Sequence, residues 1–169
     1  MINIRQGLFE TNSSSMHSIG IQRNNQFENV PEKLELKPGE FGWQHEVLSD
    51  PFEIGSYLYT AILCLSKDKK DLSDWKTYLY DACYRVGCEV SFIEPTKDEY
   101  GFENYYIDHC DELIDFLKKL RRNEKRLLRF LFGQHSFIIT SNDNDGHEYL
   151  EAMEKSLINN YVETYFKGN

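Results

Sequence analysis

The sequence predicts an α+β fold in which an antiparallel or mixed sheet is packed by about four helices, within a single domain of residues 1–169. Two observations indicate this class. Segments in which apolar and polar residues alternate, as in strands, are interspersed with segments in which apolar residues recur at helical spacing. Along the chain, these strand and helix segments do not alternate regularly, as the strands and crossover helices of a doubly wound parallel sheet do.

The extended segments come mostly from the first half of the chain. "MINIR" and "HSIGIQR" each alternate between apolar and polar residues, so we expect two short strands that flank a loop. Pro38 and Gly39 lie between two extended segments and are typical of a hairpin turn. Together the predicted strands are residues 1–5, 17–23, the two arms of 34–43, 88–95, a short strand at 105–107, and 135–142.

Helices are predicted wherever apolar residues recur at three- and four-residue intervals. The first has the clearest beginning, because Asp50 is a suitable N-cap and Pro51 suits the first turn. The segment from 111 to 131 reads as one long helix or two abutting helices. The predicted helices are residues 49–65, 71–87, 111–131 and 148–162, with a turn at 143–146.

Composition limits the cellular context. The chain is 40% hydrophobic and 28% charged, as expected of a folded protein. It lacks both a long apolar run and a signal-peptide pattern, so we expect a cytoplasmic protein with no membrane partner. The four cysteines form no C-x-x-C pair and are expected to be buried, reduced thiols.

Polar side chains with catalytic potential gather in "FETNSSSMHS", residues 9–18. A histidine can move a proton, a serine can act as nucleophile and an acid can orient the imidazole, so a hydrolytic site is one interpretation. Backbone amides, hydroxyls and an arginine could instead bind a phosphate. The third interpretation is structural, with Asn and Ser capping turns. The candidate residues are Arg5, Glu10, Ser13, Ser14, Ser15 and His17.

Residues 5–19, "RQGLFETNSSSMHSI", resemble the N-terminal signature of a family of small proteins from phages and mobile elements of Gram-positive bacteria. The resemblance covers about 15 of the 169 residues and assigns no role to individual positions. It implies an anti-CRISPR function, in which the protein inhibits a type II effector nuclease by blocking guide-RNA loading or by causing guide-RNA truncation.

A basic segment, "KKLRRNEKRLLR" at residues 118–129, holds seven of the 19 Lys and Arg residues and one acid. The rest of the chain has 12 basic and 27 acidic residues, so charge is segregated within a protein of net charge -9. On one helix the cations would form a face able to contact phosphates, or a solvated face paired with local carboxylates. The candidate nucleic-acid-binding residues are Lys118, Lys119, Arg122, Lys125, Arg126 and Arg129.

No cofactor or metal ion is expected. "SNDNDGHEYLE" matches a calcium loop only in part, because Ser141 and Ala152 stand where ligands should be. A divalent-metal nuclease site could be assembled from Asp108, His109 and Asp111 with His135 or His147, but no spacing rule singles these residues out.

Two classes of function follow. As a mobile-element inhibitor, the protein would bind a nuclease effector or its guide RNA. As an enzyme, it would cleave or transfer a phosphoester with the Glu10–His17 loop, His17 moving the proton and Arg5 steadying charge. The oligomeric state is not predicted.

Overall fold

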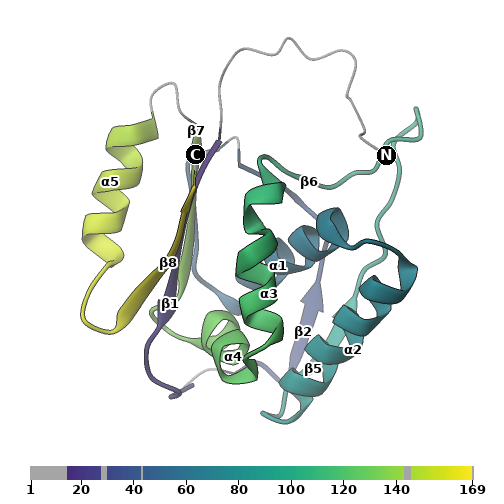
Figure 1. The fold of residues 1–169 in the computed structure, drawn as a ribbon, viewed down its shortest axis with the longest axis horizontal. Helices are drawn as coiled ribbons and strands as arrows, with labels where there is room; N and C mark the ends of the chain where they lie inside the picture. Colours follow the sequence, from purple (N-terminus) through teal and green to yellow (C-terminus); the bar gives the residue numbers. More distant parts are fainter. Residues whose placement is uncertain (1–14, 28–29, 43, 143–145, 169) are drawn as a thin grey trace.

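The main sheet has four strands, and every neighbouring pair is antiparallel (Figure 1). The computed structural model describes the whole chain except residues 1–14, 28–29, 43, 143–145 and 169. In sheet order the strands are β4 (Glu46–Leu48), β7 (Phe137–Asn142), β1 (Ser15–Gln22) and β8 (Val162–Gly168). Together with the helices this sheet confirms the predicted α+β class.

Helices cover both faces of this sheet. Helix α5 (Gly146–Leu157) lies on one face, and α1 (Pro51–Leu65) and α4 (Glu124–Phe132) lie on the other (Figure 1). Every side chain of β1 is therefore buried. Because strand side chains alternate between faces, Met16 packs in the apolar cluster beneath α5, whereas Ile19 belongs to the main core.

Two small parallel sheets complete the fold. One joins β2 (Lys33–Leu36) to β5 (Glu89–Phe92), and α2 (Lys69–Tyr84) packs against β5. The other joins β3 (Glu40–Phe41) to β6 (Tyr106–Ile107), which lies within the predicted strand at 105–107.

The predicted hairpin at Pro38 and Gly39 is wrong. The two arms are extended, but β2 and β3 pair with later strands and belong to different sheets. The backbone N–H of Gly39 donates to the hydroxyl of Thr60 in α1, and its carbonyl accepts from Tyr106. These bonds hold the segment against the helix, so it does not fold back on itself.

The beginning of α1 is as predicted. The side chain of Asp50 accepts hydrogen bonds from the backbone of Phe52 and Glu53, and the Glu53 side chain reaches back to complete a capping box. Helix α2 begins two residues before its predicted start, capped by Asp68, and ends before Gly87. The N-cap residues Asp50 and Asp68 therefore determine where α1 and α2 begin.

The segment from 111 to 131 forms two helices rather than one. A 3-10 turn (Cys110–Leu113) leads into α3 (Ile114–Arg121), and α4 follows after a break. At the break, the side chain of Asn123 accepts a hydrogen bond from the backbone N–H of Arg126 and caps α4. The second of the two alternatives is confirmed.

The predicted C-terminal helix is too long. Helix α5 ends at Leu157, and the chain then turns into β8, which the sequence interpretation missed together with β4. The Asn159 side chain accepts a hydrogen bond from the backbone of Tyr161 in that turn. In the described part of the chain, no helix combines the length and apolar character needed to cross a bilayer.

The cysteines differ in their burial. Cys83 and Cys88 are buried, as predicted. Cys110 is half-buried and Cys64 is exposed near the end of α1, so the prediction of burial is wrong for Cys64. All four are free thiols.

Candidate functional site

The structure brings together two of the six predicted catalytic residues. Arg5, Glu10, Ser13 and Ser14 lie outside the described residues. Ser15 and His17 both lie in β1, two positions apart, so their side chains share the strand face that is turned toward α1.

Ser15 and His17 are joined directly. The hydroxyl oxygen of Ser15 lies 2.9 Å from Nε2 of His17, and the hydroxyl of Tyr57 lies 2.9 Å from the other ring nitrogen, Nδ1. Tyr57 comes from the second turn of α1, so these bonds connect the helix to the sheet. All three side chains are buried, with His17 only 3% exposed.

Asp108 completes the group from the other side. Its carboxylate accepts a 3.0 Å hydrogen bond from the backbone N–H of Ser15 and a 2.7 Å bond from the hydroxyl of Tyr106 in β6. Burial alone would raise the pKa of Asp108, but these bonds and the nearby Ser15 hydroxyl outweigh burial and hold the pKa below its usual value. The buried polar cluster is therefore Ser15, His17, Tyr57, Tyr106 and Asp108.

Burial lowers the pKa of His17 from 6.5 to about 4, even though the charge of Asp108 opposes this shift. The imidazole is therefore neutral near pH 7. Burial also raises the pKa of Tyr57 above its usual value, so its hydroxyl keeps its proton.

The hydrogen bonds indicate the tautomer of His17. The Tyr57 hydroxyl is buried against Nδ1 of His17 and donates to that nitrogen, so the neutral ring carries its proton on Nε2, which donates to the Ser15 hydroxyl oxygen. In this arrangement both ring nitrogens of His17 have a hydrogen-bond partner. A serine hydroxyl that accepts a hydrogen bond from Nε2–H is not activated as a nucleophile. Activation requires the reverse direction, in which the histidine nitrogen accepts the proton of the hydroxyl.

Gly42 and His109 both have positive φ angles and lie beside the buried polar cluster. Gly42 has a φ of +114°, and a Cβ atom there would lie 3.1 Å from the Ser15 hydroxyl and 3.2 Å from Nε2 of His17. His109 is the one non-glycine residue with positive φ in the described part of the chain, and its Nε2 lies 3.8 Å from Asp108. A methyl group at position 42 would therefore require these neighbours to shift by a few tenths of an ångström, in addition to straining the backbone.

Sequence reasoning missed most of this cluster. It does not single out Tyr57, and it treats Asp108 only as a possible metal ligand. No local signal links them to Ser15 and His17, since Tyr57 is 40 and Asp108 is 93 positions away from its partner. Among the described residues, no group of three or more His, Cys, Asp or Glu side chains is placed to hold a metal ion.

The predicted basic face is divided between α3 and α4, so it is not one helical face. Four of its six cations are exposed and close in sequence; we call Lys118, Lys119, Arg122 and Lys125 the α3–α4 basic patch. Arg126 and Arg129 are half-buried, and Arg129 donates to the backbone carbonyl of Arg23. These two arginines therefore belong more to the core edge than to the surface.

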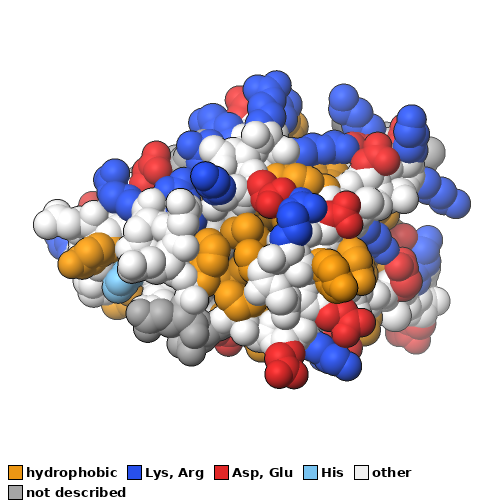
Figure 2. Space-filling model, turned by 90° about the horizontal axis from the view of Figure 1, so that it is seen from below, with side chains coloured by type: hydrophobic (Ala, Val, Ile, Leu, Met, Phe, Trp, Pro, Cys, Tyr) orange, Lys and Arg blue, Asp and Glu red, His pale blue; other side chains and the backbone are white. Residues whose placement is uncertain are grey.

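The cations of the α3–α4 basic patch differ in whether a carboxylate pairs with them. Lys118 pairs with Asp115 at 2.8 Å. Arg122 and Lys125 make no ion pair within 4 Å of a described carboxylate, although Arg122 is near enough to Asp115 to help lower the pKa of that carboxyl. Figure 2 shows the molecule from below, and most of the visible Lys and Arg side chains lie in the upper half of that view. This half is the side of the molecule that faces the viewer in Figure 1, where α3 lies. On the face that Figure 2 shows, Lys and Arg side chains are thus more numerous along this edge than along the opposite one.

Comparison of the chain with protein-family models, curated proteins and solved structures finds no match.

Proposed function

We propose that the protein is a mobile-element inhibitor of a type II CRISPR effector and that it binds the guide RNA through the α3–α4 basic patch. The observation that carries this proposal is that two cations of the patch, Arg122 and Lys125, are exposed and make no ion pair within 4 Å of a described carboxylate. Contact with phosphates requires such cations, because binding gains free energy by releasing counterions from the nucleic acid. The resemblance of residues 5–19 supports the class of target.

The buried polar cluster supports a binding protein rather than an enzyme. Ser15 and His17 are inaccessible to a substrate, the pKa of His17 is too low for an efficient base near neutral pH, and the hydrogen bonds leave Ser15 unactivated. The cluster fixes β1 to α1 and to the segment after β6. Its role is then to hold the fold from which the patch is presented.

The test measures the affinity of the protein for a fluorescently labelled type II guide RNA. Arg122→Glu with Lys125→Glu should weaken binding about tenfold or more at low salt, because two attractive contacts become repulsive. The control is Lys33→Glu with Lys155→Glu, which makes the same change in net charge at exposed lysines on β2 and α5. If both double variants bind equally well, the patch does not contact RNA.

Inhibition itself is measured by adding the protein to the effector with its guide and following target cleavage. The wild type and the Lys33/Lys155 control should inhibit, and the Arg122/Lys125 variant should not. If the wild-type protein binds guide RNA but leaves target cleavage unchanged, RNA binding is supported and inhibition of a type II effector is contradicted.

One observation favours a second candidate, a phosphoester-cleaving enzyme: the 2.9 Å bond between Ser15 and His17. Catalysis would need the opposite tautomer of His17 and access of the RNA to the cluster. Measuring guide length after incubation discriminates the two. Guide that is shortened by the wild type but stays intact with a folded His17→Gln variant would favour the enzyme, whereas intact guide with both proteins would favour the inhibitor.

A further inference from the structure

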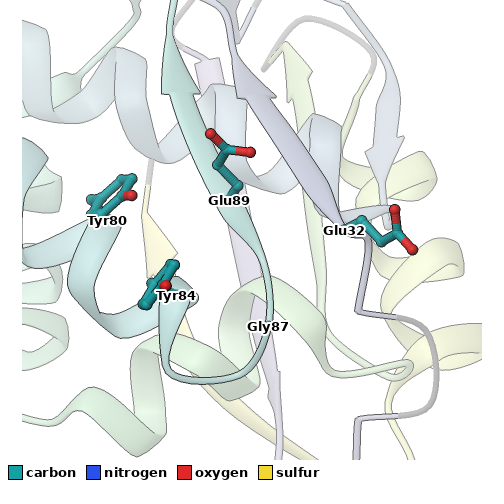
Figure 3. Close-up of a pocket in the computed structure, with 5 residues that line it drawn as sticks. All are labelled: Glu32, Tyr80, Tyr84, Gly87 and Glu89. Carbon is teal, nitrogen blue, oxygen red and sulfur yellow. The ribbon is translucent and has the colours of Figure 1, made fainter.

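A shallow hollow of about 570 Å³ lies between the C-terminal half of α2 and the start of the β2–β5 sheet (Figure 3). It is lined by Glu32, Tyr80, Tyr84, Gly87 and Glu89. The tyrosines come from α2, Gly87 from the turn after it, and Glu89 from β5, with Glu32 just before β2. It lies outside both the buried polar cluster and the α3–α4 basic patch.

Two tyrosines form one wall of the hollow. Tyr80 and Tyr84 are one helical turn apart, and their rings stack with centroids 5.8 Å apart and planes inclined by 12°. Tyr84 is 65% exposed and Tyr80 is 40% exposed. Packing within the chain therefore leaves a broad aromatic surface open to solvent, as in binding sites that take a flat or cationic group.

The hollow also carries negative charge that no ion pair with a described residue neutralises. The carboxylates of Glu32 and Glu89 are exposed and make no ion pair with any described residue. Lys33 lies opposite Glu89 in the strand register without forming an ion pair with it. Arg85, next to Tyr84, is held by Glu124 on α4. No cation of the described chain therefore occupies the hollow.

We propose that this hollow binds an arginine side chain of a protein partner. A guanidinium group can stack on an exposed tyrosine ring while donating hydrogen bonds to a carboxylate such as that of Glu89. Gly87 adds space, since a Cβ built there would meet nothing within 4 Å. Nucleic acid is disfavoured, because two carboxylates repel phosphates. The inference concerns a protein contact and does not depend on RNA binding by the basic patch.

The test is a titration with N-acetyl-arginine amide, followed by ¹H–¹⁵N chemical shifts of the full chain. The expected result is a saturable shift of the amides of Tyr80, Tyr84, Gly87 and Glu89, with a much smaller response to the citrulline analogue, which has the same shape without the charge. Tyr84→Ala and Glu89→Gln should each weaken binding about threefold or more.

The control pair is Tyr100→Ala and Glu99→Gln, which removes an exposed tyrosine and an adjacent exposed acid from another loop and should leave the affinity unchanged. The proposal is overturned if the hollow does not respond, if citrulline binds as well as arginine, or if AMP produces the same shifts more strongly. Guide-RNA affinity of the Tyr84 and Glu89 variants serves as a separate measurement, so failure here is distinguishable from failure of the RNA-binding proposal.

Discussion

The hydroxyl of Tyr57 and Nδ1 of His17 are 2.9 Å apart, and this buried hydrogen bond joins helix α1 to β1, one of the two inner strands of the main sheet. The other ring nitrogen of His17 contacts Ser15, whose backbone N–H is bound by Asp108. One continuous chain of polar contacts thus connects three segments that are distant in sequence. Its contribution to stability can be measured group by group.

Tyr57→Phe should destabilise the protein by about 1–3 kcal/mol, because it leaves Nδ1 of His17 buried without a donor. Urea denaturation near neutral pH measures this cost. The control is Tyr59→Phe on the same helix. Tyr59 is equally buried, but its hydroxyl makes no hydrogen bond within 3.5 Å to a described residue. The Lys76 ammonium, which is paired with Glu94, acts on this hydroxyl only from a longer distance. Equal losses from the two substitutions would contradict the assigned role of the Tyr57 hydroxyl.

Stability should fall as the pH falls from 6.5 toward 4. The pKa of His17 is about 4 in the folded protein and near 6.5 in the unfolded chain, so between these values the unfolded state binds more protons. Above pH 6.5 both states are neutral at this group, and no penalty applies. The full effect is about 3 kcal/mol.

Denaturation of wild type and His17→Gln between about pH 7 and about pH 4.5 isolates this term, because the lowered pKa of Asp108 acts only at more acid pH. The wild type should lose stability more steeply than the variant. Parallel curves, or an NMR titration of His17 with a midpoint near its ordinary pKa, would refute the assignment.

Gly42→Ala should cost more than Gly87→Ala. Both glycines have positive φ, +114° and +87°, so alanine strains the backbone at either position by about 1–2 kcal/mol. Only at Gly42 does the added methyl also press on Ser15, His17 and Asp108, which adds about 1–3 kcal/mol. The difference between the two variants in thermal or urea unfolding measures crowding at the buried polar cluster, and similar losses would show that the cluster yields easily.

The salt dependence of RNA binding should report the α3–α4 basic patch directly. Arg122→Gln with Lys125→Gln removes two phosphate contacts, so the slope of log affinity against log salt concentration should become shallower by about 1.5. Lys33→Gln with Lys155→Gln should retain the wild-type slope. An unchanged slope in the first variant would mean that RNA lies elsewhere on the protein.

The sequence predicts the fold where the deciding interactions are local. The Asp50 cap and the strand within residues 135–142 depend on residues a few positions apart, and both are found. The hairpin at Pro38 was mispredicted because turn residues do not reveal which strand an extended arm will pair with.

The candidate site was predictable only in part for the same reason. Ser15 and His17 are both predicted site residues, but the predicted strand begins at His17 and leaves Ser15 in the loop. The strand in fact begins at Ser15, so the two side chains share one strand face. Tyr57 and Asp108 reach them through tertiary packing, which no local pattern encodes. The basic segment was recognised from composition, but its projection on one helix placed Arg129 with the exposed cations, although it is tied to the backbone of Arg23.

Strand β1 has both its sheet neighbours, β7 and β8, near the other end of the chain. While the ribosome is still making the intervening residues, a nascent chain therefore carries β1 with its apolar side chains and backbone groups unpaired. Assembly of the sheet must wait until residues beyond 162 have emerged from the ribosome. The nascent chain must therefore avoid aggregation, alone or with the help of a chaperone, for longer than a chain whose paired strands are neighbours in sequence.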